Sequence, residues 1–192
     1  MILTLSGMDG SGKTTLSLKI AAESDRFVRV SRGGYFLLEP IMRSIRYLKG
    51  IDSKKSTKNP FLSKGDKPWL FKFWPWLVLA DDLIHYWLVL KPVSVFYNIV
   101  CDRYMYDRLI GLKYHGFLGE RAYALYKNLI PSPTKALILE VEPSIALERE
   151  TAEKHVLQFY TDLHGLYRNL AKEKSIEIID MLYYSYDRRF SL

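Results

Sequence analysis

The feature that most constrains this chain is a glycine-rich run near its start, which reads Gly7-Met8-Asp9-Gly10-Ser11-Gly12-Lys13-Thr14-Thr15. The apolar run at 2–5 predicts a short buried strand before it, and the pattern of 16–22 predicts a helix after it. Glycines let a backbone wrap closely around an anion, and the N–H groups at a helix start point toward one spot. A run of this kind between a strand and a helix, ending in Lys-Thr, predicts a phosphate-binding loop.

The side chains of this loop have distinct expected roles in holding a nucleoside triphosphate. Lys13 adds a full positive charge to the partial charge of the helix start, and Thr14 offers a hydroxyl to a Mg²⁺ ion carried by the phosphates. A turn without a ligand is the alternative, and the complete pattern disfavours it. The candidate cofactor-binding residues are Gly7, Asp9, Gly10, Ser11, Gly12, Lys13, Thr14 and Thr15.

Length and composition restrict the classes of protein that remain. A chain of 192 residues with 48% apolar residues suits a single domain, 1–192, with a substantial core. The net charge of +7 favours anionic ligands, but Lys54, Lys55 and Lys58 resemble a solvated loop more than a nucleic-acid patch. We therefore expect small-molecule nucleotide partners and no nucleic acid.

Three further observations predict a cytoplasmic chain with no membrane partner. The single cysteine, Cys101, cannot form an internal disulfide, which fits a reducing compartment. The chain enters a predicted strand directly, without the pattern of a secretory signal. The apolar stretch 69–100 is interrupted by charged residues and proline, so a helix packed against a sheet explains it better than a membrane span.

Strands and helices are predicted to alternate along the chain. Further strands are expected at 27–30, 98–101, 136–141 and 176–179. Helices are expected at 37–48, from 69 or 76 to about 91, at 106–113, at 120–129, from Pro143 onward and at 155–174, with a surface loop at 50–68. This order predicts a three-layer α/β fold, in which helices cover both faces of a parallel sheet of about five strands.

A second motif, Asp102-Arg103-Tyr104, directly follows the predicted strand 98–101. Ligands of such folds bind beyond the carboxyl ends of the strands, so this motif, the loop at Gly7 and the strand end at Arg32 should lie at one edge of the sheet. Asp102 could hold Mg²⁺, and the planar guanidinium of Arg103 could clamp phosphate oxygens. A structural ion pair at a strand end is the alternative.

With these motifs in order, the chain resembles the thymidylate kinases, a family with the P-loop NTPase fold. The resemblance covers nearly the whole chain and rests on four segments: the loop 7–15, Asp102-Arg103-Tyr104, the stretch 139–149 that contains Glu142-Pro143-Ser144-Ile145-Ala146-Leu147-Glu148-Arg149, and Tyr167-Arg168-Asn169-Leu170-Ala171 followed by Ile178-Ile179-Asp180.

The resemblance implies a role for each matching residue in ATP- and Mg²⁺-dependent transfer to a nucleoside monophosphate, with dTMP as the first candidate. Lys13 would hold ATP phosphates, and Thr14 and Asp102 would serve the metal. Asp9 would meet a sugar hydroxyl of the acceptor. The catalytic set that it implies is Lys13, Asp102, Arg103 and Arg149, with Arg149 in a lid at about 144–156, and the acceptor-binding set is Asp9, Arg32, Trp74, Asp82 and Arg103.

The chain departs from the family in its long helix, where thymidylate kinases carry an aromatic residue and an arginine that bind thymine. Val78 and Asp82 stand at those positions, and Trp74, Val78, Asp82 and His85 share a helix face by spacing. Trp74 could supply a stacking ring, and Asp82 could accept a hydrogen bond from an amino or hydroxyl group. The other interpretation makes Asp81 and Asp82 a helix-surface or ion-paired couple.

The lid is the second departure, because it is short and offers only Arg149 and Lys154 as cations, while Gly10 stands where one subclass has an arginine. Two alternatives to a thymidylate kinase activity therefore stay open. One is a kinase of the same kind with another nucleotide, a nucleoside or a small molecule as acceptor. The other is a nucleotide-binding protein with little transfer activity. The family also suggests a homodimer formed through helices beside the sheet.

Overall fold

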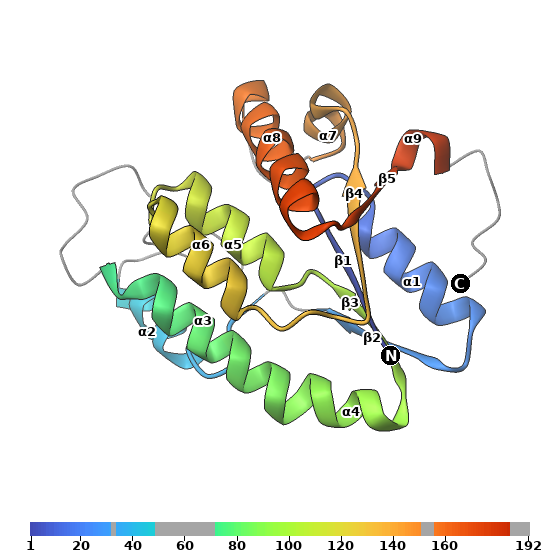
Figure 1. Ribbon diagram of the computed structural model, residues 1–192, viewed down its shortest axis with the longest axis horizontal. Coiled ribbons are helices and arrows are strands. Elements are labelled where there is room, and N and C mark those ends of the chain that lie inside the picture. The colour runs from blue at the N-terminus through green and yellow to red at the C-terminus, as the bar shows by residue number, and fades with distance from the viewer. Residues whose placement is uncertain (32–33, 49–71, 151–155, 185–192) are drawn as a thin grey trace.

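The computed structural model describes residues 1–31, 34–48, 72–150 and 156–184. Five parallel strands form one sheet in the order β2-β3-β1-β4-β5, which confirms the predicted α/β fold (Figure 1). The strands are β1 (Ile2–Gly7), β2 (Phe27–Ser31), β3 (Asn98–Asp102), β4 (Lys135–Glu140) and β5 (Glu177–Asp180).

Helices cover both faces of the sheet. On one face lies α1 (Lys13–Glu23), which packs Leu16 and Ile20 onto apolar residues of β1, β3 and β4. The opposite face is covered mainly by α3 (Trp74–His85), α4 (Lys91–Phe96), α5 (Met105–Tyr114), α6 (Glu120–Leu129) and α8 (Leu157–Lys174). The remaining helices are α2 (Glu39–Leu48), α7 (Pro143–Arg149) and α9 (Met181–Tyr184).

The long predicted helix is present and extends further than expected, through α3, a π-helical turn η2 (Tyr86–Leu90) and α4. In the turn, the Lys91 N–H donates to the Tyr86 carbonyl, five residues earlier. Pro92 follows and has no N–H to donate to the carbonyl four residues before it, so the usual bond is missing where the helix widens. The turn keeps Tyr86 and Leu90 buried.

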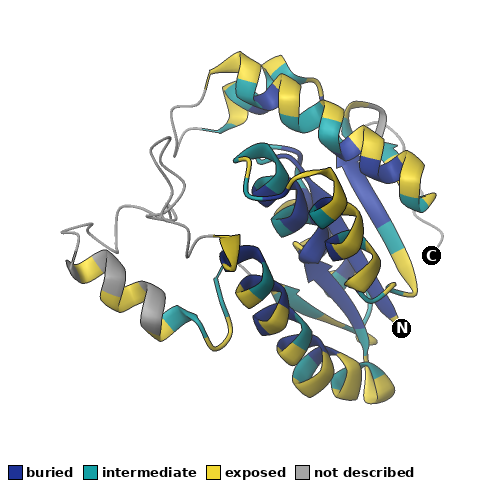
Figure 2. Ribbon diagram, turned by 60° about the vertical axis from the view of Figure 1, so that its left-hand side comes forward, coloured by how far each residue is buried: buried dark blue, intermediate teal, exposed yellow. Residues whose placement is uncertain are grey.

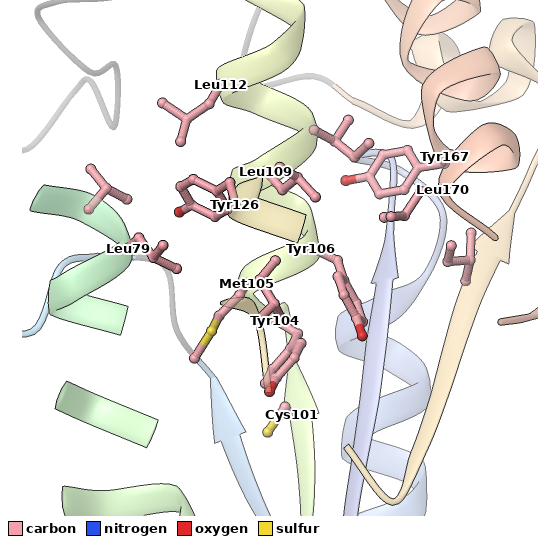
Figure 3. Close-up of a cluster of buried hydrophobic side chains, with 14 of the residues drawn as sticks. Leu79, Cys101, Tyr104, Met105, Tyr106, Leu109, Leu112, Tyr126, Tyr167 and Leu170 are labelled. Carbon is pink, nitrogen blue, oxygen red and sulfur yellow. The ribbon is translucent and has the colours of Figure 1, made fainter. Parts of the chain in front are cut away.

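The larger part of the core lies between the sheet and the helices of the α5 side, and it is rich in tyrosine (Figure 3). Tyr126 and Tyr160 are fully buried there, and Tyr167 of α8 points toward the same region. The side chain of Cys101 is buried in this core, which confirms the prediction that it is a core residue. Burial raises the pKa of its thiol to about 12. The central strands are buried along most of their length (Figure 2).

The predicted loop 50–68 and its lysine cluster lie outside the described residues. Among the helices that are described, none has both the length and the apolar content needed to cross a membrane.

Candidate functional site

The loop after β1 has the backbone conformation that its glycines predict. Gly10 and Gly12 adopt left-handed conformations, with φ of 82° and 86°. A Cβ atom at Gly10 would lie 2.7 Å from the carbonyl oxygen of Ala146 in α7, so both the conformation and the close approach require glycine. Gly12 is the N-cap of α1, which places the loop at the positive end of that helix.

Lys13 is the buried cation of this loop. Its side chain is 4% exposed, and its ammonium group donates to the carbonyl oxygens of Gly7 at 2.8 Å and Met8 at 2.6 Å. Burial lowers the pKa of Lys13, although the carboxylates of Asp107 and Asp9 act in the opposite direction. The ammonium is therefore held inside the loop by carbonyl groups of the loop itself.

Arg103 and Lys13 both approach Asp9 in the middle of the loop. The guanidinium of Arg103 donates to Asp9 Oδ1 at 2.5 Å, and Lys13 Nζ lies 3.6 Å from the same oxygen. Burial would raise the pKa of Asp9, but the charges of Arg103 and Lys13 hold it below its ordinary value. Arg103 has a φ of 76°, an uncommon conformation for a residue with a Cβ atom, found at functional sites where the surrounding structure fixes it.

Asp102 lies next to Thr14, the other residue that we predict to hold a metal ion. The Thr14 hydroxyl donates to Asp102 Oδ2 at 2.9 Å. Asp102 Oδ1 is buried and has no hydrogen-bond partner within the described part of the chain. A hydroxyl and a carboxylate are hard oxygen ligands, so these two residues fit Mg²⁺. No group of three or more His, Cys, Asp or Glu side chains among the described residues could hold a metal, so phosphate oxygens and water would complete the coordination.

The structure adds Arg29, which the sequence patterns did not single out. Arg29 lies on β2, and its Nη2 is 2.5 Å from Asp102 Oδ2 while its Nε donates to Ser17 Oγ of α1 at 2.8 Å. Asp102 therefore also forms the structural ion pair that was the alternative interpretation, with Arg29, through the same carboxylate that binds Thr14.

Asp107 is a second residue that sequence analysis missed. One carboxylate oxygen accepts hydrogen bonds from the Gly7 N–H at 3.0 Å and the Tyr167 hydroxyl at 2.8 Å, and the other accepts from the Tyr104 N–H at 2.9 Å. Burial, followed by the nearby carboxylate of Asp107, raises the pKa of Tyr167 well above its ordinary value, so its hydroxyl remains a donor. Asp107 thus joins the glycine loop, the start of α5 and α8. The only sequence signal for this role was the position of Asp107 in the first turn of the helix predicted at 106–113, where a carboxylate commonly binds backbone N–H groups.

A cavity of about 150 Å³ opens beside Arg103, between α3 and α5. Asp82 is 1% exposed and lies in its wall, where its Oδ1 is 3.1 Å from the Arg108 Nε. The Arg108 guanidinium also donates to the Gly34 carbonyl and lies 4.5 Å from the centroid of the Tyr35 ring. The lining consists of Val30, Asp82, His85, Leu90, Cys101, Arg103, Tyr104, Met105, Asp107 and Arg108.

Asp81 has a different environment from its neighbour. Its carboxylate accepts hydrogen bonds from three consecutive backbone N–H groups, those of Phe36 at 2.7 Å, Leu37 at 2.5 Å and Leu38 at 3.1 Å. Asp81 therefore fixes the segment before α2 against α3. Both aspartates are buried, so the helix-surface interpretation is wrong, and the ion-paired one applies to Asp82 with Arg108.

The other predicted acceptor residues are less directly placed. Trp74 is buried and packs edge-to-face on Tyr35 at 5.6 Å, and it does not belong to the cavity lining, so its stacking role stays a prediction. Trp74, Val78, Asp82 and His85 are all buried, in agreement with a shared face. Arg32 lies outside the described residues.

The described part of the predicted lid, 144–156, consists of 144–150, most of it in α7, and residue 156 before α8. Arg149 ends α7, and its Nη1 is 3.5 Å from the Gly10 carbonyl oxygen, which brings one cation to the glycine loop. Lys154, with the rest of 151–155, lies outside the described residues. The homodimer also stays a prediction. The aromatic side chains of Trp87 and Phe96, on the long helix that would form its surface, are 59% and 80% exposed.

Comparisons with known proteins agree with this geometry. The chain is 29% identical over 187 residues to a probable thymidylate kinase of Pyrobaculum aerophilum, covering 93% of this chain and 86% of that protein. It is 26% identical over 189 residues to a probable thymidylate kinase of Pyrobaculum calidifontis, covering 94% and 87%. The crystal structure of thymidylate kinase from Ehrlichia chaffeensis has the same fold, with a TM-score of 0.58 and 19% identity over 94% of this chain and 85% of that one. No family model matches the chain.

Proposed function

We propose, on the premise that this chain is a divergent member of the thymidylate kinase family, that it catalyses ATP- and Mg²⁺-dependent phosphoryl transfer to a nucleoside monophosphate. The names of its relatives make dTMP the first acceptor to consider, with dTDP and ADP as products. The observation that carries the proposal is the meeting of Lys13 and Arg103 at Asp9, at the N-terminal end of α1. The proposal treats 1–192 as one catalytic domain.

Phosphoryl transfer needs positioning and charge neutralisation more than covalent help from the protein. The loop amides and Lys13 would hold the donor phosphates, and Arg103, which lies between the loop and the cavity, would hold oxygens of the phosphoryl group in transfer. Thr14 and Asp102 would hold Mg²⁺, which when bound neutralises charge on the phosphate oxygens. Arg149 supplies a further positive charge beside Gly10.

The Asp82–Arg108 pair favours a second candidate, a kinase of the same kind with a different acceptor. An arginine alone would offer only hydrogen-bond donors to the molecule that receives the phosphoryl group. The Asp82–Arg108 pair also offers the oxygens of a buried carboxylate, which accept hydrogen bonds. A ligand with amino or hydroxyl groups could donate to Asp82. The cavity that the pair lines opens beside Arg103, where such a ligand would meet the transferred group.

A panel of acceptors tests the proposal. The purified chain is incubated with ATP, Mg²⁺ and one nucleoside monophosphate at a time, with nucleosides and water as further arms, and ADP release is measured. We expect release with at least one monophosphate, and dTMP first. Release with dTMP alone would exclude the second candidate. Tight ATP binding without transfer to any acceptor would contradict the kinase proposal and favour a nucleotide-binding protein.

A further inference from the structure

Arg29 occupies an unexpected position for a charged residue, because it lies within a strand of the sheet and next to the candidate metal site. In β2, Arg29 is paired with Val100 of β3, and Ser31 is paired with Asp102. Val30, the next residue, lines the cavity on the opposite face. The Arg29 side chain therefore extends on the α1 face, where Ser17 accepts from its Nε.

The carboxylate of Asp102 is shared between this arginine and the phosphate-binding loop. Its Oδ2 accepts from both Arg29 Nη2 and the Thr14 hydroxyl, while Oδ1 is buried without a partner among the described residues. The side chain of Asp102 is 3% exposed, so the carboxylate is shielded from water, while that of Arg29 is 25% exposed. A divalent cation that approaches Thr14 and Asp102 thus meets a carboxylate whose charge is already balanced.

We propose that Arg29 is a positioning residue that acts as a resident counter-ion of Asp102 and weakens the binding of the divalent cation that accompanies the nucleotide. The proposal rests on the donor site described above. Without metal, Arg29 holds the buried carboxylate of Asp102 in its orientation toward Thr14. With metal, the cation competes with Arg29 for Oδ2, or binds Oδ1 and is repelled by the guanidinium nearby.

Two physical effects decide whether removing the Arg29 charge tightens or weakens metal binding. The positive charge of Arg29 repels the incoming cation, and removing it leaves Asp102 with a buried and uncompensated charge that the metal then relieves. Both effects predict that loss of the Arg29 charge tightens metal binding. We expect a change of about fivefold, because partial exposure of Arg29, at 25%, lets solvent screen part of the repulsion.

The test measures metal binding without turnover, with Mn²⁺ as the probe. The protein is mixed with saturating ADP, free Mn²⁺ is followed by its electron paramagnetic resonance signal, and Mg²⁺ is added as a competitor. Arg29→Gln should bind Mn²⁺ about fivefold more tightly than the natural chain. Arg29→Lys keeps the charge and should stay within about twofold. Arg29→Met, whose apolar stem fills similar space, is the second charge-removing variant if Arg29→Gln does not fold.

Arg26→Gln is the matched control, because it removes the same charge from an exposed residue just before β2 begins. It should leave the Mn²⁺ affinity unchanged. Unchanged or weaker Mn²⁺ binding in the folded Gln or Met variant would overturn the proposal, and weaker binding would show that Arg29 mainly orients Asp102. If the natural chain binds no ADP, the proposed function fails instead, so the two failures are distinguishable.

Discussion

Lys13 and Asp82 are both buried charged residues, but they are held in place in different ways. The Lys13 ammonium is bound by carbonyl groups five and six residues before it, within one loop. The Asp82 carboxylate is paired with Arg108, which belongs to another helix and lies 26 positions further along the chain. The Lys13 ammonium is therefore held by local contacts, although a long-range hydrogen bond to Asp107 also holds its loop, whereas Asp82 is held by a long-range contact.

This difference has a consequence for what each side can tolerate. A loop whose conformation is set by its own glycines keeps its shape wherever a strand leads into a helix. The cavity keeps its charge balance only while α3, α5 and the segment fixed by Asp81 stay packed together. Substitutions on the phosphate side should thus impair chemistry first, and substitutions on the cavity side should impair stability and acceptor binding together.

The largest effect is expected for Lys13→Ala. The variant lacks the buried positive charge of the phosphate-binding loop, and we expect the rate of ADP formation to fall by about 10²–10³-fold or more, because preorganised charges supply most of the stabilisation in such reactions. Circular dichroism should show a folded protein. Full activity in the variant would mean that Lys13 does not hold the donor phosphates, or that a contaminant produced the ADP.

Arg108→Met tests the cavity side. It removes the guanidinium that lies 3.1 Å from Asp82, a residue that is 1% exposed, and we expect the free energy of unfolding to fall by about 3 kcal/mol. In chemical denaturation, the double variant Asp82→Asn with Arg108→Met should recover part of this loss, since it removes both charges of the pair. If the pair also contacts the acceptor, the KM for the acceptor should rise while the KM for ATP stays unchanged. Equal stability of the single and double variants would contradict the pairing.

Gly10→Ala sharpens the comparison, because it introduces a clash with α7 into the loop in which local contacts hold Lys13. Its Cβ atom would meet the Ala146 carbonyl at 2.7 Å in a left-handed backbone conformation. We expect a loss of about 2 kcal/mol in the free energy of unfolding. Gly119→Ala is the control, because nothing lies within 4 Å of the added atom and its φ is −71°. A similar loss of stability in both variants would contradict the idea that the close approach of Ala146 requires glycine at position 10.

Tyr167→Phe removes the hydroxyl that donates to Asp107, which also accepts from Gly7. A lost hydrogen bond of this kind is worth about 1–2 kcal/mol, and we expect a loss of that size in thermal or chemical unfolding. ADP formation should fall less than in Lys13→Ala, because Gly7 keeps its bond to Asp107. Complete loss of activity in a folded Tyr167→Phe protein would place Tyr167 in the reaction itself.

The smallest effect concerns pH. The hydrogen bond from Arg168, together with the charge of His164, holds the pKa of Glu140 below its ordinary value of 4.5. The unfolded chain therefore takes up this proton first as the pH falls, and the folded state loses the contribution of Glu140 below about pH 4.5. Unfolding measured between about pH 5 and pH 3 should show this loss, below about 1 kcal/mol, and Glu140→Gln should flatten the slope. An unaltered slope in that variant would assign the acid sensitivity to other carboxylates.

Much of the fold was predictable because its signals are local. The alternation of short apolar runs with helical patterns predicted the five strands, since the central strands of a parallel sheet are buried on both faces, and the partly exposed edge strands β2 and β5 are still apolar enough to stand out. The π-helical turn was not predicted, although Pro92 contributes to it, because a proline near a helix start is usually compatible with regular geometry.

The sequence by itself determined the phosphate-binding loop, the Asp102-Arg103 motif and the parallel sheet that brings them to one edge. It did so because glycine conformation, strand burial and helix starts depend on residues a few positions apart. Only the tertiary structure decided that Arg29 pairs with Asp102, that Asp107 joins three elements and that Arg108 balances Asp82. Those partners are between 26 and 100 positions apart, and their charges meet because the packing of helices on the sheet, rather than any local pattern, sets which side chains share a buried space.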